Sequence, residues 1–287
     1  MTSHLNLGRI DYLNCRPLYE MLEHDRALAD ITLIPGHPAD LNRALKDGSL
    51  DLSPSSSMLL ATAEEKKFFI LADLAIISRD EVRSVLLVSR RPPRQLEGGE
   101  IALTGHSLTS VFLLKIILFH FYRLDPKTIT FRTQEFSADS PQESFLVIGD
   151  QALTLYHHPP AGYQIYDLGR LWHSFTNLPF VYALWIGRSS VLERQRAVIA
   201  RLHRKLLEIM DRLPDRLNAL AETTLKRGSH GNELSTKQLL DYWQKAIFYR
   251  LDEKALAGLD CFFNHARELG LIEKIPQLSF FPDAFRK

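Results

Sequence analysis

The chain has 287 residues, of which 45% are hydrophobic and 24% charged, which is enough for one large domain or two lobes with separate cores. Its formal charge of +1, with basic and acidic residues interleaved, argues against a nucleic-acid partner. No stretch reaches the ~18 uninterrupted apolar residues that span a bilayer, and the first residues lack the pattern of an export signal. We therefore expect a cytoplasmic protein without a membrane span.

Three predicted strands each end in a loop of hydroxyl or amide side chains that leads into a predicted helix. The first strand ends at Asn14 and Arg16, and Pro17 opens the following helix because its fixed φ suits a first turn. The next two strands end at Ser55–Ser57 and Thr104–Ser110. Open α/β sheets bind ligands where strand ends meet helix N-termini, so these loops predict a site for a small anion. Each hydroxyl taken alone fits a simple helix cap equally well.

The remaining elements predict two lobes. Aliphatic strands over 82–89 and 180–186 flank a central unit, and the chain is predicted to be helical from Ser190 onward. Strands that alternate with helices favour a mostly parallel sheet covered on both faces. We predict an α/β fold in which residues 1–88 and 184–287 form lobe 1 and residues 89–183 form lobe 2. The crossovers are expected near 86–90 and 181–186, with the ligand in a cleft between the lobes.

The sequence leaves two possible roles open for His106 and for Asp150. His106 lies in the third loop and is either an acid or base or an ordinary polar side chain. Asp150 follows a buried strand and is either a helix cap or a site carboxylate.

Motifs for metals, cofactors and covalent catalysis are missing. Cys15 and Cys261 are too few and too far apart for a disulfide framework or a CxxC metal pair, so both are expected to be reduced thiols. No spacing of histidine, cysteine and carboxylate residues indicates a zinc site. The nucleophile-elbow, P-loop and dinucleotide signatures are absent as well. We expect no metal and no cofactor.

The opening stretch Gly8-Arg9-Ile10-Asp11-Tyr12-Leu13-Asn14-Cys15-Arg16-Pro17-Leu18 resembles the first motif of the chorismate dehydratases of the futalosine route to menaquinone. Further blocks resemble this family in the same order, over roughly residues 8–186: Pro38–Asn42, Gly48–Ser56, Val82–Val85, Ser107–Ser110, Ile148–Leu153, Tyr166–Gly169 and Leu178–Trp185. The resemblance implies the fold of type II periplasmic binding proteins. Two turns depart from the family pattern, because Arg79-Asp80-Glu81 replaces an expected glycine and Asn177 stands where glycine is usual.

The resemblance also implies an activity, that of a carbon–oxygen lyase. Chorismate would lose water and become 3-[(1-carboxyvinyl)oxy]benzoate, with aromatisation of the ring as the driving force. Asn14 would orient and polarise the reacting ring, and Asp150 would be the reserve acid or base; the proton acceptor is a protein group or the substrate's own carboxylate. One substrate carboxylate would bind Ser84, Ser107, Thr109 and Ser110, and the other would bind Ser55 and Ser56.

Two other functions fit the same fold. The sister enzyme of the pathway converts a cyclic futalosine derivative to a dihydroxynaphthoate, and the sequence Tyr12-Leu13-Asn14 favours the dehydratase over it. A non-catalytic binding protein for a small carboxylate should carry an export signal or a lipid-anchor cysteine, and the sequence shows neither. The sequence leaves the oligomeric state open.

Overall fold

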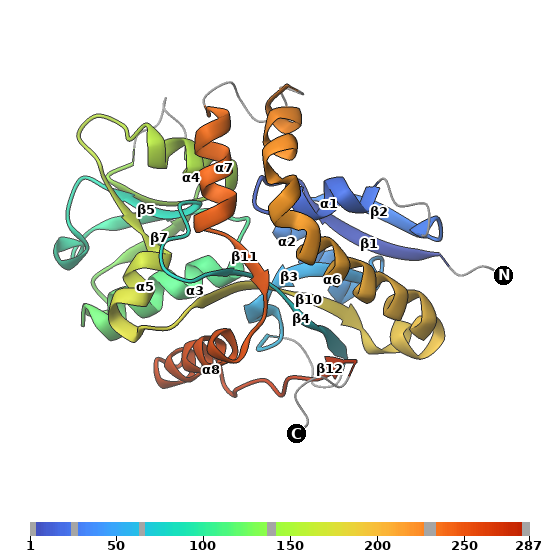
Figure 1. Ribbon diagram of the computed structural model, residues 1–287. Coiled ribbons are helices and arrows are strands. Elements are labelled where there is room, and N and C mark those ends of the chain that lie inside the picture. Colours follow the sequence, from blue (N-terminus) through green and yellow to red (C-terminus); the bar gives the residue numbers. More distant parts are fainter. Residues whose placement is uncertain (1–3, 24–27, 63–66, 137–141, 227–233, 283–287) are drawn as a thin grey trace.

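A computed structural model describes residues 4–23, 28–62, 67–136, 142–226 and 234–282. Two β-sheets lie side by side, each with helices packed on it (Figure 1). The larger sheet has seven strands in the order β11-β4-β10-β3-β1-β2, with β12 paired to β4. The smaller sheet has five strands in the order β7-β6-β8-β5-β9.

The larger sheet draws its strands from both ends of the described chain. Its strands are β1 (Leu5–Ile10), β2 (Ile31–Gly36), β3 (Leu52–Ser56), β4 (Phe68–Ser78), β10 (Phe180–Arg188), β11 (Phe248–Arg250) and β12 (Phe280–Phe281). Helices α1 (Arg16–Glu23) and α2 (Pro38–Asp47) join its first three strands. The central strand β10 is buried along almost its whole length, which explains its unbroken apolar sequence.

The smaller sheet is continuous in sequence. Its strands are β5 (Val85–Ser89), β6 (Glu100–Leu103), β7 (Thr130–Thr133), β8 (Ser144–Ile148) and β9 (Gln164–Asp167). Its helices are α3 (Leu108–Ile116), the π-helix η4 (Ile117–Phe121), α4 (Gly149–His157) and α5 (Leu168–Thr176). Short 3₁₀ turns are η2 (Ser57–Leu59) and η3 (Pro93–Gln95).

The expectation of a mostly parallel sheet is wrong. β10 runs antiparallel to β3 and β4, β11 runs antiparallel to β4, and β5 runs antiparallel to β8 and β9. β5 and β10 are the strands through which the chain enters the smaller sheet and returns to the larger one, so neither belongs to a β–α–β crossover. Sheet membership changes between Ser78 and Val85 and again between Asp167 and Phe180. We propose these segments as the lobe crossovers, slightly earlier in the chain than the sequence suggested.

The C-terminal region is mainly helical, as expected, but it also supplies β11 and β12. It contains α6 (Ser189–Lys226), α7 (Thr236–Lys245) and α8 (Glu253–Glu268). α6 contains Pro214 and is interrupted only at Gln195, where the backbone leaves the helical conformation. Helix α7 stands between the two sheets and packs against α6 (Figure 1). In the part of the chain that the structure describes, no helix combines the length and apolar character needed to cross a membrane.

The turns that depart from the family pattern have local explanations. Asn177 ends α5 in the left-handed region, with φ 56° and ψ 24°, where glycine is most common and asparagine is tolerated. In the first crossover, Glu81 forms ion pairs with Arg83 and Arg170. The buried carboxylate of Asp167 accepts hydrogen bonds from the backbone N–H groups of Val82 and Arg83. The crossover is therefore fastened to the start of α5.

Candidate active site

A cavity of about 570 Å³, counted with its solvent-open mouth, lies where the two sheets meet. Most of the wall is apolar, from residues such as Ile10, Ile76 and Val85. The polar side chains in the wall are Tyr12, Asn14, Ser56, Ser84, Ser107, Ser110 and Tyr182. Five of the eight predicted site residues are therefore brought together, and Ser55, Thr109 and Asp150 are not among the lining residues.

The turn between β1 and α1 is held from three other elements. The backbone N–H of Leu13 donates to Asp150 Oδ1 at 2.8 Å. The carbonyl of Leu13 accepts from Trp243 Nε1 at 2.7 Å, and that of Asn14 accepts from the Tyr249 hydroxyl at 2.6 Å. These bonds come from α4, α7 and β11, so the position of Asn14 depends on both sheets. Asp150 thus acts on the backbone of this turn.

Asn14 offers the cavity an unsatisfied polar atom. Its side chain lines the cavity, and its Oδ1 is buried with no hydrogen-bond partner among the described residues. A buried amide oxygen left without a partner carries a free-energy cost, so its position needs an explanation, such as a polar ligand group that completes the hydrogen bond. Asn14 is therefore poised to bind a polar group of a ligand.

The second polar group is at the start of α3. Ser107 caps this helix, with its Oγ accepting from the backbone N–H of Ser110 at 3.3 Å. The hydroxyls of Ser107 and Ser110 lie 2.8 Å apart. One of the two hydroxyl protons occupies this bond, which leaves the other free to bind a ligand. Both side chains line the cavity at the positive end of a helix dipole, an arrangement suited to an anion.

The hydroxyls at the end of β3 make contacts between the sheets. Ser56 Oγ lies 2.5 Å from Thr109 Oγ1 and accepts from the Thr109 backbone N–H at 3.1 Å. Thr109 Oγ1 also lies 3.3 Å from Ser57 Oγ. Thr109 therefore joins the start of α3 to the larger sheet. Ser55 is fully buried, and its Oγ has no partner in the described chain. Neighbouring side chains of a strand point to opposite faces, which separates Ser55 from Ser56.

Ser84 and Gly149 form another part of the wall. The Tyr242 hydroxyl donates to Ser84 Oγ at 2.8 Å, and Ser84 Oγ donates to the Val82 carbonyl at 3.3 Å. Gly149 has a φ of 68°, and a Cβ there would lie 3.1 Å from ring carbons of Tyr12. Glycine is thus required both by its backbone conformation and by the close tyrosine ring.

A row of aromatic side chains stands beside the cavity. The Tyr12 hydroxyl oxygen lies 3.5 Å from His37 Nδ1, and the rings of His37 and His106 stack at a centroid distance of 4.6 Å. Burial, together with the charges of Asp150 and Glu135, raises the pKa of Tyr12 to about 12, so its hydroxyl stays protonated at neutral pH. His106 does not line the cavity and touches His37 instead.

Sequence reasoning missed several aromatic residues of the site. The position of Tyr12, two residues before Asn14, is the one signal that was available. Tyr182, Tyr242 and Trp243 reach the cavity wall or the Asn14 turn from distant segments. Tyr182 lies in the family-like block Leu178–Trp185, whereas no motif marks Tyr242 or Trp243.

The groups in the cavity wall that could favour an anion are helix ends and hydroxyls. None of the described residues that line the cavity is a lysine or an arginine. The first residues of α2 and α4, Pro38 and Gly149, lie in the wall together with the start of α3. The N-terminal end of a helix carries a partial positive charge, so three such ends in the wall favour an anion, which the neutral hydroxyls can then orient. The site therefore fits a compact anionic molecule with an apolar ring.

Comparison with known proteins agrees with this chemistry. A family model described as menaquinone biosynthesis matches residues 5–268. A chorismate dehydratase of Thermus thermophilus is 29% identical over 282 residues, covering 92% of this chain and 95% of that protein. A chorismate dehydratase of Campylobacter jejuni is 25% identical over 268 residues, covering 92% and 98%.

Solved structures define the fold. The alkanesulfonate-binding protein of Xanthomonas axonopodis pv. citri superposes with a TM-score of 0.72 at 13% identity, covering 95% of each chain. The expected periplasmic-binding-protein-like fold is confirmed.

Proposed function

The chain belongs to the menaquinone biosynthesis family, and from this premise we propose that it is a chorismate dehydratase. The substrate, chorismate, has an apolar ring and two carboxylates, which suits a mostly apolar cavity with helix N-termini in its wall. The product would be 3-[(1-carboxyvinyl)oxy]benzoate, which makes the enzyme a carbon–oxygen lyase. A cytoplasmic location belongs to the same proposal, in keeping with a biosynthetic enzyme.

The observation that carries this proposal is the buried, unpartnered Oδ1 of Asn14 in the cavity wall. The amide can accept from the ring hydroxyl of chorismate through Oδ1 and donate to it through Nδ2. It is too weak a base to take a proton at neutral pH. Asn14 therefore orients and polarises the hydroxyl that leaves, while the turn that carries it is held by Asp150, Trp243 and Tyr249.

The two substrate carboxylates have distinct binding groups in this account. Ser107 and Ser110, at the start of α3, bind one of them, with Ser84 on the neighbouring wall. Ser56 and the N-terminal end of α2 face the other. Thr109 positions Ser56, and Ser55 has no direct contact with substrate in this assignment.

The reaction removes a proton from the ring carbon that bears the enolpyruvyl ether and the hydroxyl from the neighbouring carbon, which leave together as water. Aromatisation supplies the driving force, so the protein contributes orientation and a site sheltered from solvent. The enolpyruvyl carboxylate of the substrate takes this proton and passes it to the departing hydroxyl, so that water is released. Asp150 serves as a positioning residue, because its Oδ1 is hydrogen-bonded to the backbone of Leu13.

Mass spectrometry of chorismate incubated with the purified chain tests this proposal. We expect a product lighter by one water. Chorismate that binds but stays intact would instead indicate a binding protein. Conversion of the cyclic futalosine derivative without conversion of chorismate would indicate the sister enzyme.

A further inference from the structure

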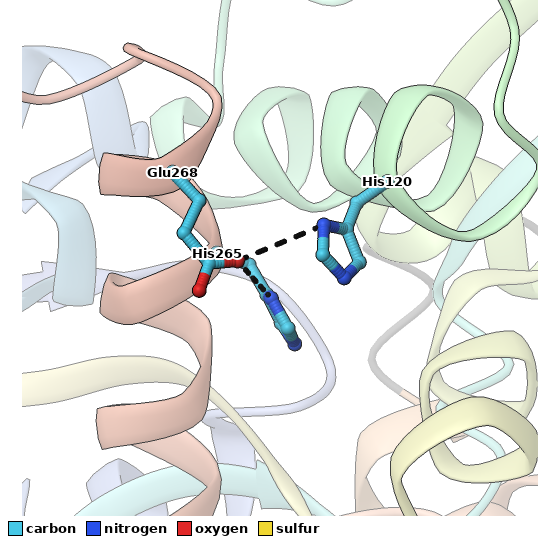
Figure 2. Close-up of side chains that lie close together, drawn as sticks. All are labelled: His120, His265 and Glu268. Atoms are coloured by element: carbon cyan, nitrogen blue, oxygen red, sulfur yellow. Dashed lines mark hydrogen bonds and ion pairs between the residues drawn. The ribbon is translucent and has the colours of Figure 1, made fainter.

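Two histidines and a glutamate meet on the side of the molecule formed by η4 and α8, and we propose that they bind a divalent transition metal such as Zn²⁺. His120 comes from η4, and His265 and Glu268 come from the last turn of α8 (Figure 2). The site is separate from the cavity, whose lining includes none of these three residues. The inference is independent of the proposed dehydratase activity.

The geometry is close to that of a metal centre. Glu268 Oε2 lies 3.1 Å from His265 Nδ1 and 3.8 Å from His120 Nδ1, and the three ligand atoms all lie within 4.8 Å of one another. Ligand atoms around a tetrahedral zinc ion are about 3.3 Å apart, given bond lengths of about 2.0–2.1 Å. The contact between Glu268 and His265 already has this spacing, and the His120 side chain would have to move closer to bind the same ion. In Figure 2 both imidazole Nδ1 atoms face the carboxylate, so the three potential donors share one small volume.

The backbone and the surrounding rings fix these side chains. His265 and Glu268 are three residues apart on α8 and so share one helix face. His120 lies in a π-helical turn, a rare conformation that is frequent at functional sites and that turns its side chain away from the α-helical register of α3. The ring of Phe121 meets both imidazoles edge-on, at centroid distances of 5.1 Å and 5.3 Å. The ligands are thus largely preorganised.

The chemical nature of the three side chains indicates which metal ion they would bind. Two imidazoles and one carboxylate suit Zn²⁺ and its borderline neighbours in the first transition row, whereas Mg²⁺ and Ca²⁺ prefer oxygen ligands. The Glu268 side chain is 53% exposed, which gives the ion a path from solvent and leaves room for a water as fourth ligand. Binding replaces the contacts between His265, His120 and Glu268 with metal–ligand bonds and releases any proton held on the two Nδ1 atoms.

The metal would link two parts of the fold. α8 packs on β10 of the larger sheet, while η4 continues α3, which begins at the cavity. A shared ion would hold the far end of α3–η4 against α8. We therefore expect Zn²⁺ to raise the melting temperature of the protein.

Metal titration of the full chain, free of any affinity tag and treated with a chelator, tests the site. We expect one equivalent of Zn²⁺ by calorimetry, and visible d–d bands of a tetrahedral centre when Co²⁺ is added. His120→Ala and His265→Ala should each weaken Zn²⁺ binding at least about 100-fold, and Glu268→Gln about 10-fold or more. Circular dichroism and melting of the metal-free variants show whether each one is folded.

Two matched variants serve as controls. His158→Ala removes an exposed histidine elsewhere, and Cys261→Ser removes the thiol one turn before His265. Both should bind Zn²⁺ as the unaltered chain does. The proposal is overturned if the unaltered chain binds no equivalent of Zn²⁺, if folded His120→Ala or His265→Ala binds as tightly as it does, or if Cys261→Ser loses the site.

Discussion

The carboxylate of Asp150 accepts a hydrogen bond from the backbone N–H of Leu13 at 2.8 Å, across the boundary between the two sheets. Leu13 directly precedes Asn14, whose buried Oδ1 lies in the cavity wall. The bond therefore joins α4, at the end of the smaller sheet, to the turn that presents the proposed catalytic amide. Substitutions at Asp150 should act through this turn.

Asp150→Asn and Asp150→Ala distinguish a positioning role from a chemical one. An asparagine keeps an acceptor oxygen for the Leu13 N–H, so this variant should retain chorismate turnover within about fivefold. Alanine removes the acceptor, and we expect kcat to fall about 50-fold or more because Asn14 is misplaced. Steady-state kinetics of both variants gives the comparison. If asparagine abolishes activity as fully as alanine does, Asp150 acts as the acid or base.

Ser107→Ala should weaken binding of the product, which carries the same two carboxylates as chorismate. Loss of one hydroxyl contact to a carboxylate corresponds to about a tenfold rise in Kd, measured by calorimetry. The change also removes a helix cap, at a cost of about 1 kcal/mol in stability. Ser235→Ala removes the cap of α7 outside the cavity wall and serves as a matched control. Equal product affinities in the two variants would remove Ser107 from the carboxylate site.

Asn177 tests the explanation given for a departure from the family pattern. Its φ of 56° is tolerated by asparagine and glycine but is strained for other residues. Asn177→Ala should lower the free energy of unfolding by about 1 kcal/mol, whereas Asn177→Gly should change it by only a few tenths. Urea denaturation measures both. Equal stabilities of the alanine and glycine variants would show that the left-handed turn imposes no such requirement.

Asp167 should give stability an unusual dependence on pH. Burial raises its pKa from an ordinary 3.8 to about 6, against three backbone N–H groups that favour the carboxylate. Between about pH 4 and pH 6 the folded chain keeps a proton that the unfolded chain releases, so this group's contribution to stability falls as pH rises, by about 3 kcal/mol in total.

Asp167→Asn removes this titration while keeping a residue suited to cap α5. The difference in unfolding free energy between the two proteins, followed by urea denaturation across this range, should therefore change with pH. A difference in unfolding free energy that stays constant over this pH range would contradict the raised pKa of Asp167.

The sequence allowed us to predict those features that depend on residues close together in the chain. Asn14 and Ser107 follow strands and precede helices, so their convergence at one sheet edge follows from α/β geometry. The antiparallel direction of β10 was hidden, because it depends on a return from the other sheet and leaves no mark in an apolar strand. Trp243 and His120 gain their roles only through partners far away in the chain, and no spacing rule connects them.

Turnover of chorismate by the unaltered chain and by Asn14→Ala, measured side by side by mass spectrometry, tests the central claim most directly. We expect a product lighter by one water from the unaltered chain, at least about a 100-fold slower reaction in the variant, and an almost unchanged unfolding free energy. Asn218→Ala, an exposed change on α6, should match the unaltered chain in both respects. No loss of water with the unaltered chain, or an equal rate in Asn14→Ala, would contradict the account.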